Sequence, residues 1–137
     1  MAEFTPYPVE VLTPEGFAYQ GDAQRLVAPG AAGELGVLAN HAPLISLLKP
    51  GEIRVTDEAG EVHRFAADEG FLQVRANRAL VLVGEAVEAE KIDGGEAARR
   101  LDEARNALDR AEQGDGDVHA ARRELRFAEA LVKTARG

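Results

Sequence analysis

All six prolines of this 137-residue chain lie within its first fifty residues, which disfavours long helices there. Short apolar or alternating runs occur instead, for example at 9–12, 71–74 and 80–83, and turn-forming residues such as Pro50-Gly51 separate them. Short strands spaced about 8–12 residues apart predict an antiparallel β-sandwich or barrel. A parallel sheet would need crossover helices, for which the sequence leaves no room.

Near residue 91 the apolar period changes to one typical of helices. Two stripes recur at alternating steps of three and four residues: Ala97, Leu101, Ala104, Leu108 and Ala111, then Val118, Ala121, Leu125, Ala128, Val132 and Ala135. The segment 114–117, Gly-Asp-Gly-Asp, ends the first helix and caps the second, and Asp93 with Glu96 forms a capping box. The sequence therefore predicts an α+β fold, with an N-terminal antiparallel β-sandwich over 1–88 and a C-terminal two-helix antiparallel hairpin over 89–137.

The stripes of the hairpin contain more alanine than leucine, so the two helices bury little apolar area against each other. Gly94 and Gly95, just before the first helix, are expected to supply a flexible joint. We therefore expect a mobile hairpin that needs a partner surface.

Composition excludes several classes of function. The net charge of −8 argues against nucleic acid as a partner, because phosphate binding needs a surplus of cations. No cysteine is present, so disulfides and thiolate metal sites are excluded. No apolar run approaches the ~20 residues of a membrane helix, and the N-terminus lacks the layout of a secretory signal, so we expect no direct membrane insertion.

No catalytic constellation emerges from the motifs. The glycines at 30, 33 and 36 lack the spacing of a phosphate loop, and the three histidines, His41, His63 and His119, lack metal-ligand spacing. His63 is expected to face solvent. The only serine, Ser46, lacks the glycines of a nucleophile elbow. We expect a protein that is not an enzyme and needs no cofactor.

Arginines cluster on the second predicted helix, at Arg122, Arg123 and Arg126. Such a cluster is typical of an ordinary charged helix face. The alternative is an electrostatic patch for an acidic protein partner. Spacing alone leaves both interpretations open.

The segment 33–44 reads G-E-L-G, four further residues, then H-A-P-L. In this it resembles the epsilon subunit family of bacterial and chloroplast F-type ATP synthases. Supporting segments lie in order at 11–16, 49–54 and 70–74, so the resemblance covers essentially the whole chain.

The resemblance implies a non-catalytic subunit of the central stalk, peripheral at the cytoplasmic face of the cell membrane. The sandwich would contact the gamma subunit and the ring of c subunits, with Glu34 facing the ring and His41 the gamma side. This contact would couple ring rotation to ATP synthesis. The hairpin would either fold on the sandwich or extend toward the alpha and beta subunits of the catalytic head, where it would inhibit ATP hydrolysis.

Some family members bind ATP through a motif Ile/Leu-Asp-x-x-Arg-Ala. Here Ile92, Asp93 and Ala97 match, but Glu96 replaces the arginine, which reverses the charge that would meet phosphate. The resemblance thus implies at most weak ATP binding, unless Arg99 or Arg100 substitutes. A self-contained nucleotide-sensing module is the alternative function, and a hydrolase of unknown type is a third.

Overall fold

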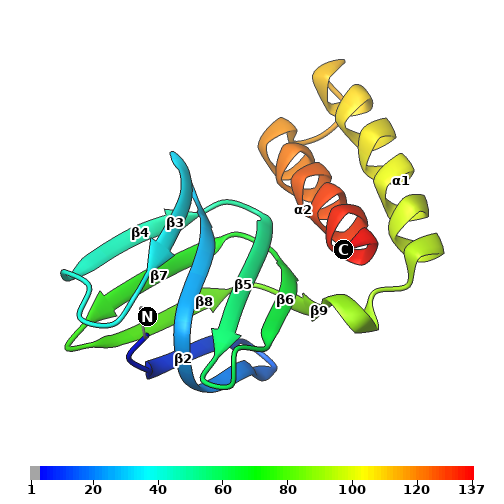
Figure 1. Cartoon of the computed structure of the whole chain (residues 1–137). Helices are drawn as coiled ribbons and strands as arrows, with labels where there is room; N and C mark the ends of the chain where they lie inside the picture. The colour runs from blue at the N-terminus through cyan, green and yellow to red at the C-terminus, as the bar shows by residue number, and fades with distance from the viewer. Residues whose placement is uncertain (1–3) are drawn as a thin grey trace.

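A computed structural model describes residues 4–137 of the chain. Nine strands come first, followed by one short 3-10 helix and two α-helices (Figure 1). Their bounds are β1 (Tyr7–Thr13), β2 (Gly16–Gly30), β3 (Gly33–Val37), β4 (Leu44–Leu48), β5 (Gly51–Asp57), β6 (Val62–Ala67), β7 (Gly70–Arg75), β8 (Arg78–Val83), β9 (Ala86–Glu88), η1 (Ala89–Lys91), α1 (Gly94–Glu112) and α2 (Val118–Arg136). The predicted α+β fold, a β-sandwich followed by two helices, is confirmed.

The strands form two layers, one of β1, β8, β7 and β4 and one of β2, β5, β6 and β9, with β3 beside β2 (Figure 1). The 15-residue β2 belongs to both layers, because its first half pairs with β1 and its second half with β3 and β5. A strand that changes layers in this way links the two sheets without a helix.

One pair of strands departs from the predicted antiparallel arrangement. β1 and β8 run parallel, in register from Val9 opposite Ala79 to Leu12 opposite Leu82. The other strand pairs are antiparallel as predicted, so this pair is an exception within an antiparallel sandwich. A parallel connection needs a long crossover, and here the intervening strands of the sandwich supply it in place of a helix.

The inward faces of both sheets build the core. Fully buried side chains alternate along the strands with more exposed ones, as in Val9 and Val11 of β1 and Ile53 and Val55 of β5. Phe65 of β6 is also buried in this cluster. The period of two that predicted the strands thus reflects an inside and an outside of the sandwich.

Asp93 and Asp117 cap the two helices as predicted, although the Glu96 carboxylate of the expected capping box accepts from Arg99. The side chain of Asp93 accepts a hydrogen bond from the amide of Glu96, and Asp117 accepts one from Ala120. The expected glycine joint differs, because Gly94 is already the first residue of α1. The first amides of a helix have no partner within the helix, so glycine there weakens it less than in the interior. The link to the sandwich is η1 instead.

The hairpin lies against the sandwich, with α2 between α1 and the strands (Figure 1). Of the stripe predicted on α2, only Ala128 is buried. Phe127, Ala130 and Leu131 are also buried, on a neighbouring face, in one cluster with Ala66 of β6 and Ala97 of α1. The sequence stripes missed this face because they followed only the seam between the helices.

His63 does not simply face solvent as expected. Its side chain is 27% exposed, and its Nε2 lies 2.9 Å from Oδ2 of Asp57. The imidazole ring also lies 5.3 Å from the ring of Tyr19, measured between centroids. His63 therefore joins a small polar and aromatic cluster on the outer face of the sandwich.

Candidate functional site

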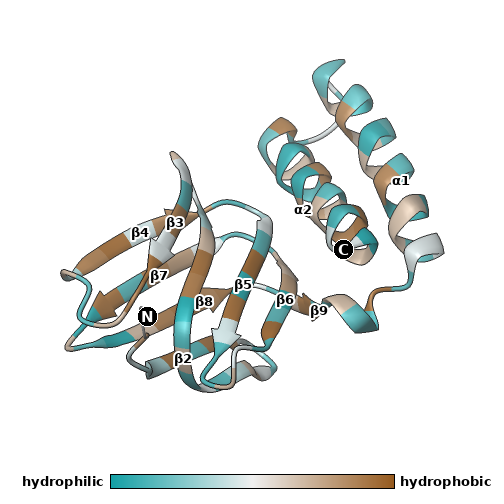
Figure 2. Ribbon diagram, viewed as in Figure 1, coloured by the Kyte–Doolittle hydropathy of each residue, from teal (hydrophilic) through white to brown (hydrophobic). Residues whose placement is uncertain are grey.

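The outer face of β1, β8, β7 and β4 carries a continuous apolar row. Strand register places Leu12 beside Leu82, Leu82 beside Phe71, and Phe71 beside Leu47. Ile45, two residues before Leu47, points the same way along β4, and the two are 73% and 71% exposed. Figure 2 shows the hydrophobic colour along β4. We call these five residues the apolar row; a solvent-exposed row of this kind marks a docking surface.

The outer face of the opposite sheet carries charged residues of β5 and β6. Arg54 of β5 donates to Glu52 at 3.1 Å, and Arg64 of β6 donates to Glu52 at 2.7 Å. Burial alone would raise the pKa of Glu52, but these hydrogen bonds outweigh it and hold the pKa below its usual value. This charged face is the one that α2 packs against. The hairpin thus covers both these charged residues and Ala66 on this sheet, and leaves the apolar row of the other sheet open.

Glu34 and His41, the residues predicted to contact different partners, lie apart in the fold. Glu34 belongs to β3, and its carboxylate lies 3.4 Å from the guanidinium of Arg54. His41 is exposed in the loop between β3 and β4, and its Nδ1 lies 2.8 Å from the carbonyl oxygen of Ala42. This loop leads directly into β4, which bears Ile45 and Leu47 of the apolar row.

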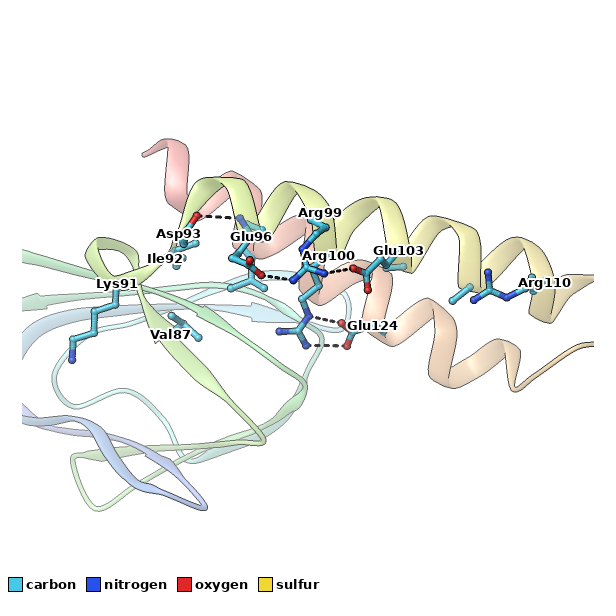
Figure 3. A pocket seen from close by; sticks show the side chains of 14 residues that line it. Val87, Lys91, Ile92, Asp93, Glu96, Arg99, Arg100, Glu103, Arg110 and Glu124 are labelled. Carbon is cyan, nitrogen blue, oxygen red and sulfur yellow. Dashed lines mark hydrogen bonds and ion pairs between the residues drawn. The ribbon is translucent and has the colours of Figure 1, made fainter.

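The three residues that match the ATP motif lie together. Ile92, Asp93 and Ala97 line a cavity of about 650 Å³ between η1, α1 and α2 (Figure 3). Glu96 lines the same cavity. The structure therefore gathers these residues at one site.

Two arginines of this cavity, Arg99 and Arg100, already have carboxylate partners. Arg99 donates to Glu96 and, at 2.6 Å, to Glu103 (Figure 3). Arg100 donates to Glu124 of α2 at 2.6 and 3.3 Å, and its guanidinium carbon lies 4.9 Å from the ring centroid of Phe127. The carboxylate of Glu124 raises the pKa of Arg100, which stays charged. A phosphate group would have to compete with these carboxylates.

The arginines of α2 do not form a single patch in the folded hairpin. Arg122 lies 3.7 Å from Glu112 of α1, while Arg123 lies 3.9 Å from Glu69 of the sandwich. Arg126 instead lines a cleft of about 520 Å³ beside the β4–β5 turn. Two of the three thus contact acids of their own chain.

Sequence reasoning missed the apolar row and the Arg64 contacts. The row had a detectable sign, since 80–83 is apolar without alternation and 44–48 is apolar except for Ser46, which is typical of strands covered on both faces. Across residues 4–137, none of the helices is long and apolar enough to cross a membrane. The same residues contain no group of three or more metal-ligating side chains.

Together, the fold and its surfaces define a class of protein: a small β-sandwich with a helical hairpin folded on one sheet and an apolar row on the other. Residues 7–89 match the family model described as the β-sandwich domain of the ATP synthase delta/epsilon chain. The chain therefore belongs to the ATP synthase delta/epsilon chain family.

Individual relatives agree with this membership. The chain is 40% identical over 125 residues to the ATP synthase epsilon chain of Xanthomonas campestris pv. campestris, covering 90% of this chain and 86% of that one. Among solved structures, it resembles a chain of the Euglena gracilis mitochondrial ATP synthase OSCP/F1/c-ring, with a TM-score of 0.81, 24% identity, and coverage of 99% and 85%. It also resembles a chain of the Tetrahymena thermophila mitochondrial ATP synthase central stalk and c-ring, with a TM-score of 0.63, 15% identity, and coverage of 98% and 99%.

Proposed function

We propose that this chain is a non-catalytic coupling and regulatory subunit in the central stalk of a proton-transporting F-type ATP synthase. It works as two units, the sandwich over 1–88 and the hairpin over 89–137. The sandwich joins the gamma subunit to the c ring, so that ring rotation reaches the catalytic head. The whole chain acts as a peripheral protein at the cytoplasmic face of the cell membrane.

The observation that carries this proposal is the apolar row. Ile45 and Leu47 are each more than two-thirds exposed, and apolar side chains across four paired strands gain free energy only when a partner covers them. The hairpin packs on the other sheet, so the row is available for a separate chain. The solved structures that resemble this chain come from stalk and c-ring assemblies, which supports a stalk subunit as that partner.

Glu34 and His41 divide the contacts in this proposal. His41 sits in the loop that enters β4, next to the apolar row, so it faces gamma. Glu34 lies on β3, away from this row, and faces the c ring. Its pairing with Arg54 fixes the carboxylate without burying it, since the side chain remains 63% exposed.

The hairpin supplies regulation. In the folded state Arg122 and Arg123 contact Glu112 and Glu69, two acids of their own chain. Extension of the hairpin releases Arg122 and Arg123 and, with Arg126, carries them toward an acidic segment of the catalytic head, where the hairpin blocks rotation in the hydrolysis direction. Exposed ion pairs are each worth less than about 1 kcal/mol, so such an exchange of partners can be reversible.

Co-purification tests the docking role. The full chain is co-expressed with the gamma subunit as wild type, as Leu47→Glu, and as Val62→Glu. Val62 is also exposed, at 49%, but lies on the opposite sheet, so it is the matched control. We expect gamma to be retained by the wild type and Val62→Glu and lost with Leu47→Glu. Failure of the wild-type chain to retain gamma would refute the proposal.

Removal of the hairpin tests the regulatory role. The reconstituted complex is assembled with the full chain or with a chain ending before Asp93, and steady-state ATP hydrolysis is measured. We expect faster hydrolysis with the shortened chain and unchanged incorporation of the subunit. Equal rates at equal incorporation would leave a coupling role without inhibition.

A further inference from the structure

We propose that Asn77 is a positioning residue that holds the loop 38–43 in the conformation that docks to the stalk partner. We call this segment the docking loop. The inference rests on the proposed function, since it assigns a role within the same docking surface. It concerns the β7–β8 turn, where the sequence offered Asn77 as a turn-forming residue but no functional role.

The contact joins two turns that are far apart in sequence. The backbone amide of Asn40 donates a hydrogen bond of 2.7 Å to Oδ1 of Asn77, 37 residues later. Asn40 directly precedes His41 in the docking loop. The side chain of Asn77 therefore fixes the backbone next to the histidine proposed to face the partner.

The backbone at this contact is unusual. Among residues 4–137, the non-glycine residues with positive φ are Asn40, at 61°, Ala76, at 51°, and Asn77, at 58°. All three lie at the meeting point of the two turns. Uncommon backbone conformations of this kind persist where the surroundings hold them, and they cluster at functional sites.

The start of the docking loop is fixed by a second contact. The hydroxyl of Tyr7 donates to the carbonyl oxygen of Val37 at 2.7 Å, and both side chains are buried. Burial raises the pKa of Tyr7 to about 12, so its hydroxyl keeps the donated proton. Tyr7 holds Val37 from the core and Asn77 holds Asn40. Of the residues before His41 in the docking loop, only 38 and 39 therefore lie between fixed points and can change conformation.

Strand order places this loop beside the apolar row. The docking loop continues into β4, where Ile45 pairs with Gln73 of β7, and the same hairpin of β7 and β8 ends in the turn that carries Asn77. The Asn40–Asn77 bond is exposed, unlike the buried contacts that hold the two sheets together. Its effect falls on the loop at the edge of the docking surface, where pre-organisation increases affinity by reducing the entropy lost on binding.

Two variants distinguish loss of the Asn40–Asn77 hydrogen bond from a change in the backbone of the turn. Asn77→Gly removes the acceptor but suits the positive φ at this position, whereas Asn77→Asp keeps both an acceptor oxygen and tolerance of that φ. Each variant of the full chain is titrated with the gamma subunit, and amide hydrogen exchange is measured on the free chain. Exchange at Asn40 reports the contact directly, and exchange at Val55 in the core reports the fold.

We expect Asn77→Gly to weaken gamma binding about three- to tenfold, the value of one net hydrogen bond, and Asn77→Asp to bind like the wild type. Exchange at Asn40 should accelerate only in Asn77→Gly, with Val55 unchanged in both. Wild-type binding by Asn77→Gly, or unchanged exchange at its Asn40, would overturn the proposal. If the wild type itself fails to bind gamma, the proposed function fails, while the exchange result still shows whether the contact exists.

Discussion

The guanidinium of Arg64 in β6 donates a hydrogen bond of 3.0 Å to the carbonyl oxygen of Thr134 in the last turn of α2, 70 residues away. The same Nη2 donates to Glu52 at 2.7 Å. A helix C-terminus carries partial negative charge and carbonyls without partners, so a cation there is favourable. Arg64 thus connects the charged face of the sandwich to the folded hairpin.

We expect Arg64→Met to shift the hairpin toward its undocked state. The change leaves Glu52 and the Thr134 carbonyl short of a donor, which costs about 1–3 kcal/mol. The undocked population should rise by roughly 5- to 150-fold. Because the chain contains no cysteine, probes attached to cysteines introduced at the exposed positions Ala59 and His119 can report the distance between sandwich and hairpin.

Arg25→Met is the control for this experiment. Arg25 is an exposed arginine of β2 on the same domain, and among residues 4–137 it makes no ion pair. Its replacement should leave the distance distribution unchanged. Identical distributions for Arg64→Met and the wild type would contradict a role of Arg64 in docking.

Acid should destabilise the sandwich through Glu52. Arg64 and Arg54 hold the pKa of Glu52 below its ordinary value of 4.5 in the folded protein, although burial opposes this. The ionised form therefore stabilises the fold above pH 4.5, and this contribution is lost as pH falls through the lower folded pKa. Urea unfolding between pH 6 and 3 should show a smaller loss for Glu52→Gln than for the wild type. If the free energy of unfolding falls equally with pH in Glu52→Gln and in the wild type, Glu52 is not a source of the acid sensitivity.

ATP binding by the wild-type chain should be weak. Glu96 and Glu103 pair with Arg99, and Glu124 pairs with Arg100, so the two arginines closest in sequence to the motif position already have carboxylate partners. Glu96→Arg supplies the missing cation of the motif and should tighten ATP binding by about tenfold or more, because charge-assisted contacts are the strong ones. Calorimetry measures both affinities.

The matched control is Glu90→Arg, which makes the same charge change in η1 at an exposed position outside the cavity. It should leave ATP binding unchanged. Tight binding by the wild type would show that the motif position occupied by Glu96 does not decide nucleotide affinity.

Ala76→Gly should stabilise the sandwich. A left-handed backbone at φ 51° strains an alanine but not a glycine, and this gain exceeds the extra entropy of glycine in the unfolded chain. We expect a net gain of about 0.5–1 kcal/mol in the free energy of unfolding, measured in urea. Ala59→Gly, in a turn where alanine has negative φ, should lose a similar amount. If Ala76→Gly and Ala59→Gly both lower the free energy of unfolding, the backbone of Ala76 is not strained.

Several features of the protein could be predicted because their causes are local. The strands alternate with period two, the helices have stripes of period three to four, and Asp93 and Asp117 cap helices through residues three positions away. The ATP-motif residues Ile92, Asp93 and Ala97 lie close together in sequence around the start of α1, so their meeting in one cavity also follows from local spacing. The roles of Glu34, His41 and the α2 arginines stay predictions, since they depend on other chains.

Tertiary structure alone decided the rest. The sequence determined that β1 and β8 are strands, but their parallel pairing depends on how β2 crosses between the layers. Phe127 follows no predicted stripe, because its face of α2 is buried by Ala66 of another element. The bonds from Arg64 to Thr134 and from Asn40 to Asn77 span 70 and 37 residues. Local periodicity fixes which face of an element is apolar, whereas the packing of the whole sandwich decides which distant residues that face meets.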